Sequence, residues 1–211
     1  MSNTKSSIVK SIDKVVINAR QKYNEIMDSE HVGKDIRIDG KPTRGQIEEN
    51  TRKTNVKEEC TRTVTCMLDV VVKRGSIVEV RDNNEQDYSY SGIVTNIPNV
   101  TPVDYYFQVL LFNTIVKRYR KDLVYSEDGY VIDDNPLIED NIPCFVQRVG
   151  KRERQIDVGI DSDSVNEIIA SKEWDIQVGD ILHVGSEKYK MTDIKELDSD
   201  ILWGYMTYYR E

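Results

Sequence analysis

Short segments in which apolar and polar residues alternate recur from residue 60 onward, and they restrict the fold of this chain more than any other feature. In the first of them, Cys60, Val64, Cys66 and Leu68 share one face of an extended chain and threonines share the other. Turn-forming residues separate the later segments, which cover residues 76–81, 91–96, 123–125, 130–132, 144–149, 155–158, 180–184, 188–194 and 201–208. A period of two is that of a β-strand with one buried face. Many short strands at hairpin spacing predict a mainly β fold, a small barrel or sandwich of hairpin-linked strands.

The segment 105–116 is apolar on both alternating faces, as a strand in the middle of a barrel or sandwich would be. A core helix is the alternative, but the aromatic and β-branched residues favour a strand. Asp39-Gly40 predicts a tight hairpin, and Pro42 restricts the returning strand to an edge, so we expect a small exposed flap. The charged stretch 45–59 fits either a loop or a solvated helix. We detect no repeat within the sequence.

The first thirty residues follow a helical pattern instead. Apolar residues fall on one narrow stripe from about Ser6 to Glu30, at Ile8, Ile12, Val15, Ala19, Tyr23 and Ile26. The stripe packs either on the chain's own sheet or on a neighbouring subunit. A second, short helix is predicted near residues 164–171, because Ser164 and Glu167 have the spacing of a capping box. The expected organisation is therefore an N-terminal helix (1–33) and a β-rich domain (34–211), which is one barrel or sandwich or two sub-barrels.

The chain is acidic, with a net charge of −8 over 211 residues. This sign argues against tight general binding of DNA, because such proteins must neutralise many phosphates. Cys60, Cys66 and Cys144 are an odd set without C-x-x-C spacing, and no apolar leader precedes them, so we expect reduced thiols in a cytoplasm. We expect neither export nor membrane insertion.

Residue types that carry catalysis or bind metals are sparse. We expect structural or surface roles for His31 and His183, since neither has a partner at a recognisable spacing. The cluster Asp157, Asp161 and Asp163 fails as an EF-hand loop, because Asn166 and Lys172 occupy the places of its glycine and glutamate; we expect turn and capping duties for these carboxylates. No phosphate-binding loop or familiar catalytic signature is present. We therefore expect no enzyme activity, no metal and no cofactor.

Two basic runs are the only features typical of a nucleic-acid-binding protein. The first contains Lys117, Arg118, Arg120 and Lys121 around Tyr119, which could stack on a base. The second is Lys151–Arg154. In so acidic a chain, a solvated face or an ion-paired interface is the favoured interpretation and a contact to phosphate is the alternative.

Two segments are similar to strand pairs of a known group of proteins. Residues 74–80, Arg-Gly-Ser-Ile-Val-Glu-Val, and residues 178–194, Val-Gly-Asp-Ile-Leu-His-Val-Gly-Ser-Glu-Lys-Tyr-Lys-Met-Thr-Asp-Ile, resemble strand pairs of phage head–tail connector and head-closure proteins. Between them, residues 95–100, 109–117 and 142–146 follow the order found in such proteins from phages of Gram-positive hosts. The resemblance spans about residues 34–205 through short motifs. It departs before Ile93, where the chain has Tyr88-Ser-Tyr-Ser-Gly92 in place of an expected tryptophan.

The resemblance implies a structural component of a tailed-phage neck that links the portal to the tail and lines the DNA channel. Its expected partners are further copies of the chain in a ring of about six or twelve subunits, a portal or adaptor ring above and tail-side proteins below. Strand edges and the helical stripe would make the subunit contacts, and an acidic lumen would let DNA slide without sequence-specific binding. The expected location is the virion neck, assembled in the host cytoplasm, and no membrane is involved. A nucleic-acid-binding barrel that uses Lys117, Arg118, Arg120 and Lys121 is the alternative.

Overall fold

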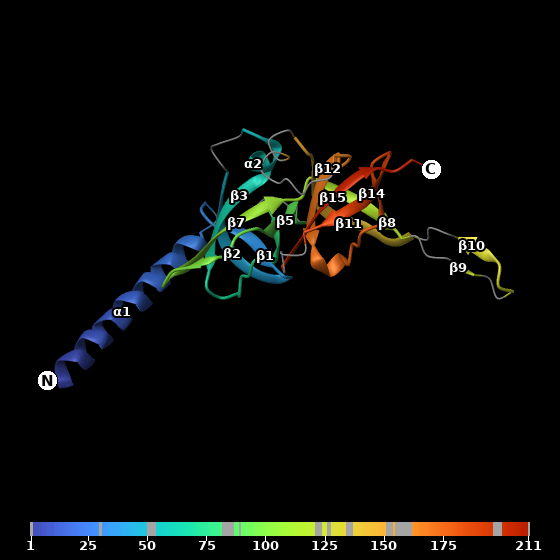
Figure 1. The fold of residues 1–211 in the computed structure, drawn as a ribbon. Helices are drawn as coiled ribbons and strands as arrows, with labels where there is room; N and C mark the ends of the chain where they lie inside the picture. The colour runs from blue at the N-terminus through green and yellow to red at the C-terminus, as the bar shows by residue number, and fades with distance from the viewer. Residues whose placement is uncertain are drawn as a thin grey trace. The chain divides into compact units, whose positions relative to one another are not determined.

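The computed structural model describes residues 2–29, 31–49, 54–81, 87–88, 90–120, 124–125, 128–133, 137–150, 154, 162–195 and 200–210 (Figure 1). The chain divides into two compact units, Met1–Leu110 and Leu111–Glu211. Strands dominate both units, so the prediction of a mainly β fold with a long N-terminal helix is confirmed. Among the described helices, none combines the length and the apolar character that crossing a membrane requires.

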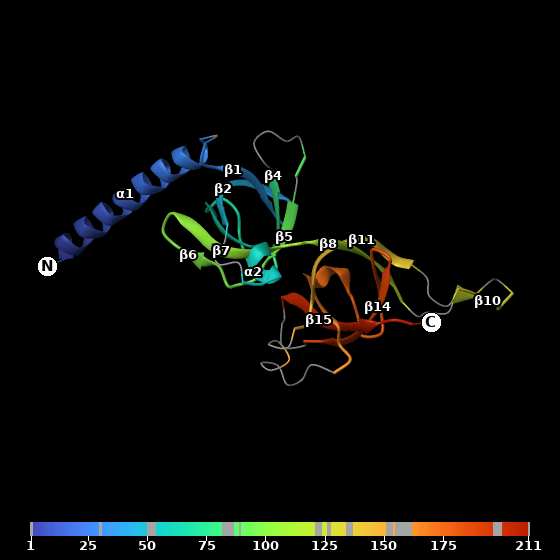
Figure 2. The same ribbon diagram turned by 90° about the horizontal axis from the view of Figure 1, so that it is seen from above.

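The first unit is a closed six-stranded barrel preceded by a helix. Its elements are α1 (Ser2–Met27), β1 (Lys34–Ile38), β2 (Lys41–Glu49), α2 (Val56–Cys60), β3 (Thr61–Met67), β4 (Ile77–Arg81), β5 (Tyr90–Val94), β6 (Asn99–Val100) and β7 (Asp104–Leu111). The strands follow the order β3-β2-β1-β4-β5-β7 around the barrel, and a β3–β7 pairing closes it. The short β6 pairs with β7 beside this ring. From above, the strands enclose a core while α1 extends from them (Figure 2).

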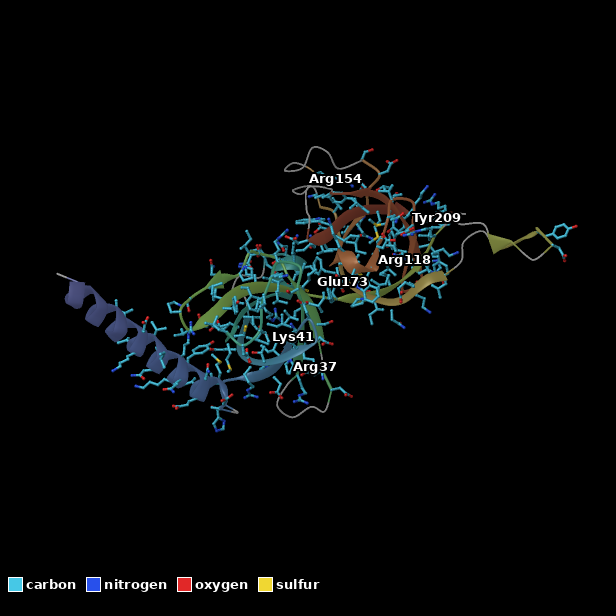
Figure 3. All side chains as sticks on the ribbon, turned by 90° about the horizontal axis from the view of Figure 1, so that it is seen from below. Arg37, Lys41, Arg118, Arg154, Glu173 and Tyr209 are labelled. Atoms are coloured by element: carbon cyan, nitrogen blue, oxygen red, sulfur yellow. The ribbon has the colours of Figure 1, made fainter. Side chains whose placement is uncertain are left out.

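The second unit is also a closed barrel of six strands. Its elements are β8 (Thr114–Tyr119), β9 (Val124–Tyr125), β10 (Val131–Asp133), β11 (Leu137–Arg148), β12 (Asn166–Ser171), the 3-10 helix η1 (Lys172–Trp174), β13 (Ile181–Val184), β14 (Glu187–Ile194) and β15 (Ile201–Tyr208). The barrel runs β11-β12-β15-β14-β13-β8, while β9 and β10 form a separate two-stranded sheet. Side chains fill the inside of each barrel (Figure 3).

The two barrels have the same connectivity. When the strands of each barrel are counted along the chain, both rings follow the order first, second, third, sixth, fifth, fourth. In the first unit these strands are β1, β2, β3, β4, β5 and β7, and in the second unit they are β8, β11, β12, β13, β14 and β15. The chain therefore contains a structural repeat that its sequence does not reveal.

The turn before the fourth strand shows the repeat in detail. In the first unit, Gly75 has a φ of 86°, and the backbone N–H of Lys73 donates to Ser76 Oγ at 3.1 Å. The N–H of Gly75 donates to the carbonyl of Val94 at 2.8 Å, and the N–H of Val94 donates to the carbonyl of Ser76 at 2.9 Å. Only glycine adopts this positive φ at low cost, so the turn needs it.

The second unit repeats each of these bonds. Gly179 has a φ of 98°, and the N–H of Gln177 donates to Asp180 Oδ2 at 2.9 Å. Gly179 N–H donates to the carbonyl of Met191, and Met191 N–H donates to the carbonyl of Asp180, both at 2.9 Å. The two segments that resemble neck proteins thus begin at the same turn of two equivalent barrels.

The strand registers extend this correspondence into the two cores. When Gly75 is aligned with Gly179, the strand pairings of the two barrels define pairs of equivalent residues. These pairs are Ile36 and Val116, Thr43 and Ile142, Val64 and Ile168, Cys66 and Ala170, Val78 and Leu182, and Val109 and Met206. Both members of every pair are buried. One repeated pattern of inward-facing residues therefore specifies both barrels.

The prediction of a short helix near residues 164–171 is wrong, because this segment contains β12. Ser164 Oγ is buried without a hydrogen-bond partner among the described residues, so the capping box does not form. Glu167–Ser171 are all buried, and β12 pairs with β11 on one side and β15 on the other. Closure of the barrel outweighs the local helical signal.

The expectation that Pro42 confines its strand to an edge is also wrong, since β2 lies between β1 and β3. Pro42 is tolerated because it pairs with Arg37 of β1, while the pairing with β3 begins only at Gly45. In both barrels every strand has a neighbour on each side, whereas β6, β9 and β10 lie at sheet edges.

The apolar segment 105–116 divides into β7 and β8, which belong to different barrels. It is extended, as predicted, but it is not buried on both faces, since Tyr106 is 44% exposed and Ile115 is 58% exposed. The charged stretch 45–59 is partly strand and partly helix. β2 continues through it to Glu49, and α2 buries none of its residues.

Candidate interaction surfaces

The second half of α1 is attached to the first barrel. Val16 and Tyr23 are half-buried and Met27 is buried, and their spacing places them on one face of the helix. Tyr23 Oη is buried without a hydrogen-bond partner among the described residues. Burial, together with the nearby Asp104 carboxylate, raises the pKa of Tyr23. The Arg20 guanidinium donates to the carbonyl of Pro102 on the β6–β7 connection.

Arg44 of β2 fixes the C-terminal end of α1. Its Nε donates to the carbonyl of Met27 at 3.0 Å, and its Nη2 donates to the carbonyl of Gly33 at 2.8 Å. A cation at this end of a helix also complements the helix dipole. Asp35 orients the guanidinium by accepting from Arg44 Nη1 at 2.6 Å, and it accepts a second bond from Arg81. These bonds from Arg81 and Arg44 lower the pKa of Asp35.

A neighbouring face of α1 remains uncovered within the first unit. Ile12 is 57% exposed, Val15 68% and Ile26 52%, and Ala19 between them is also exposed. We call Ile12, Val15, Ala19 and Ile26 the outer stripe. Tyr23, which the sequence assigned to the same stripe, belongs to the face that contacts the barrel, and the side chain of Ile8 lies outside the described part of the chain. The N-terminal half of α1 has no other described element of the first unit beside it in either view (Figures 1 and 2).

The basic run of β8 does not form an exposed cluster. Arg118 is 6% exposed, and its Nη1 donates to the carbonyl of Trp174, while its Nε is buried with no partner in the described part of the chain. The registers match Arg118 with the buried Ile38 of the first barrel, so the arginine occupies an inward-facing position. Lys117 is exposed, and Lys121 and Lys151–Glu153 lie outside the described residues. Arg154 donates to the carbonyl of Ser164.

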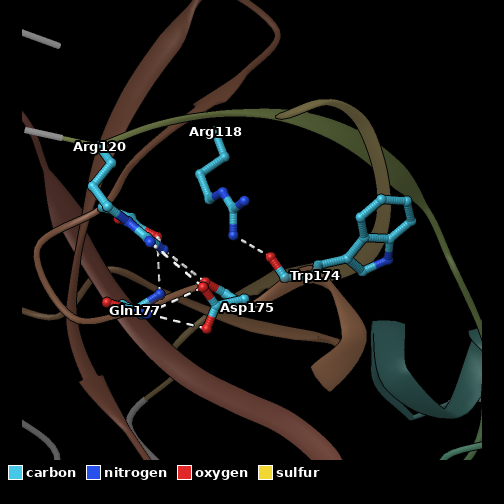
Figure 4. A network of polar contacts seen from close by, with 6 residues as sticks. Arg118, Arg120, Trp174, Asp175 and Gln177 are labelled. Atoms are coloured by element: carbon cyan, nitrogen blue, oxygen red, sulfur yellow. Dashed lines mark hydrogen bonds and ion pairs between the residues drawn. The ribbon is translucent and has the colours of Figure 1, made fainter. Parts of the chain in front are cut away.

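Arg120 is held by the loop that follows η1 (Figure 4). Its Nε and Nη2 donate to the two carboxylate oxygens of Asp180 at 2.8 and 3.0 Å, and Asp180 is 1% exposed. Nη2 also donates to the backbone carbonyl of Asp175 at 2.7 Å. The Arg120 guanidinium and the Gln177 amide lower the pKa of Asp175, the amide having the larger effect. Arg118 and Arg120 therefore bind this loop, which is an internal role that the sequence did not indicate.

The second unit carries an insertion where the first has a tight turn. Asp39 and Gly40, with φ of 50° and 76°, connect the first two strands of the first barrel. In the second barrel, residues 120–136 separate the equivalent strands β8 and β11 and include β9 and β10. We call residues 124–139 the arm. Its described exposed residues include Asp128, and Tyr130 (76%), Leu137 (48%) and Ile138 (41%).

The structure assembles no catalytic or metal site from the residues considered above. His31 lies exposed in a turn, and the ring of His183 lies against that of Tyr119, with centroids 4.2 Å apart and the planes tilted by 30°. Asp163 lies exposed in a turn, while Asp157 and Asp161 fall outside the described residues. Within the described ranges, no three His, Cys, Asp or Glu side chains are grouped so that they could hold a metal ion.

The three cysteines are free thiols. Burial raises the pKa of Cys66 and of Cys144 to about 12, and it also raises the pKa of Cys60. Thiols with raised pKa values are poor nucleophiles at neutral pH, because only the thiolate reacts.

No family model, no curated protein and no solved structure matches this chain. The outer stripe of α1 and the exposed part of the arm are two surfaces on which a functional inference can be built.

Proposed function

We propose that this chain is a non-enzymatic structural protein that works by assembling into a homo-oligomer through α1. The observation that carries this proposal is the contrast between the two faces of that helix. One face is fastened to the barrel by Tyr23, Met27 and Arg44, while the outer stripe exposes three β-branched residues to solvent. Burying each such side chain against a partner is worth about 1.5–3 kcal/mol, so the stripe is a strong candidate for a subunit contact.

The specific form that we propose is a ring in a tailed-phage neck, a head–tail connector or head-closure component between portal and tail. The support is the resemblance of residues 74–80 and 178–194 to strand pairs of such proteins, together with the acidic composition. A net charge of −8 would let packaged DNA pass a channel wall without adhering to it. Closed barrels suit a ring subunit, because they have no free edges that would add strands without limit.

Two matched substitutions on α1 test the assembly proposal. Ile12→Asp places a carboxylate in the outer stripe, and Ile17→Asp places one on another face of the same helix, where Ile17 is 54% exposed against 57% for Ile12. Exposed substitutions of this kind change the free energy of unfolding by only about 0.5 kcal/mol, so both variants should fold. We expect Ile12→Asp to abolish the oligomer and Ile17→Asp to preserve it, as measured by sedimentation velocity over a range of concentrations. Equal behaviour of the two variants would contradict the proposal.

A further inference from the structure

Up to residue 136 the arm is an addition to its barrel, and its last three residues begin β11. The first barrel has the same strand order and joins the equivalent strands through Asp39-Gly40 alone. The second barrel therefore closes by the same connectivity that the first achieves without an arm. An insertion that the fold does not require is a candidate for a separate role.

The arm's own contacts leave it incompletely packed. β9 and β10 pair with each other, and neither belongs to the barrel sheet. A single two-stranded hairpin is marginally stable in water, so its order depends on something packed against it. Tyr130 is 76% exposed and Leu137 is 48% exposed, which leaves apolar surface for that contact.

The charges of the arm and of α1 are opposite. Residues 124–139 contain five acidic residues and no basic residue. Ser2–Met27 contains five basic and two acidic residues, although the whole chain has 29 basic and 37 acidic residues. The helix is thus a basic segment in an acidic protein, and Lys22 falls among the residues of the outer stripe at helical spacing. Two copies of α1 would repel each other, whereas α1 and the arm attract.

We propose that the outer stripe of α1 docks on the arm of a second copy of this chain. This inference rests on the proposed function, and it specifies the subunit contact as one between two different surfaces. Such a heterologous contact leaves a free helix on one subunit of every dimer and a free arm on the other subunit. Repeating it around an axis closes a ring.

Complementary defects test this arrangement. The helix-defective chain is Ile12→Asp. The arm-defective chain has residues 121–135 replaced by Asp-Gly, which leaves a four-residue loop of a common hairpin length between Tyr119 and Leu137. Each variant alone should be monomeric in native mass spectrometry. The helix-defective chain keeps its arm, and the arm-defective chain keeps α1. Their mixture should therefore form a one-to-one heterodimer and nothing larger.

A second arm variant and a set of charge reversals distinguish the loss of this contact from misfolding of the deletion variant. Tyr130→Lys changes one exposed side chain and should also prevent assembly. Lys22→Glu, and separately Asp128→Lys with Glu139→Lys, should each weaken association by about tenfold or more. A mixture of the two charge-reversed chains should recover the lost affinity for the contact between them.

The outcomes separate this inference from the proposed function. A wild-type oligomer that both arm variants also form would overturn the helix–arm contact and leave assembly through α1 standing, as in a helix–helix contact. A wild-type chain that stays monomeric at every concentration would overturn both. Monomers in the mixture of helix-defective and arm-defective chains, when the wild type assembles, would also overturn the helix–arm contact.

Discussion

The two barrels of this chain share a framework and differ in what is attached to it. Both have the same strand order and the same glycine turn before the fourth strand. The first barrel adds α1, fastened by Arg44 and Asp35, and the second adds the arm and an internal cluster of Arg118, Arg120 and Asp180. The comparison separates residues that build a barrel from residues that distinguish one barrel from the other. The second group is where we look for function.

The largest expected difference between the barrels concerns the fourth residue of the shared turn. Asp180→Ala should cost ~3 kcal/mol of stability in the second unit, because it leaves the Arg120 guanidinium without its buried carboxylate. Ser76→Ala should cost only about 1 kcal/mol in the first unit, where a neutral hydroxyl donates to Asp39 at 2.8 Å. Urea unfolding followed by NMR signals from β4 and β13 measures each unit by itself. Equal losses of stability would show that Ser76 and Asp180 stabilise their units to the same extent.

A smaller loss of stability, from replacing the glycine of the turn, should be the same in both barrels. Gly75→Ala and Gly179→Ala each force a side chain into a positive φ, which costs about 1–2 kcal/mol. The same NMR-detected unfolding should give similar losses, and Val178→Ala, at an exposed position in the second turn, serves as the control. A large loss of stability for one glycine variant and none for the other would show that the two turns are not equivalent.

The smallest effect is a dependence on pH in the first unit. Hydrogen bonds from Arg81 and Arg44 lower the folded-state pKa of Asp35 below its unfolded value of about 3.9. Its contribution to stability is therefore present above about pH 4 and is lost as the pH falls through the folded pKa. We expect Asp35→Asn to be less stable than the wild type at neutral pH and to lose less stability on acidification. An unchanged acid response of the first unit, followed by NMR signals from β1 during urea titrations, would rule out this role for Asp35.

The period-two segments predicted the strand-rich fold, and most strands lie where alternation placed them. The short helix near residue 164 was wrong because Ser164 and Glu167 have a helical spacing, while pairing with β11 and β15, distant in sequence, decides the conformation. The repeat escaped detection because matched core positions hold different residues, such as Cys66 and Ala170 or Thr43 and Ile142. Burial constrains size and polarity at these positions but not identity.

The candidate surface was predictable in part. The helical spacing of apolar residues predicted the stripe, and the structure shows Ile12, Val15 and Ile26 exposed on one face of α1. Spacing could not show that Tyr23 turns toward the barrel, because that depends on where the barrel meets the helix. It also could not show that Arg118 is buried, since the residue lies in a basic run of a strand whose partners come from residues 137–148 and 181–184.

The central claim is that this chain works by assembling around an axis. Rotational symmetry in electron-microscope images of the purified protein, or of its complex with a portal, tests it most directly. We expect ring-shaped particles whose class averages show one rotational symmetry, and the same rings for Ile17→Asp but not for Ile12→Asp. Single, asymmetric particles at every concentration, with no attachment to a portal, would contradict the claim.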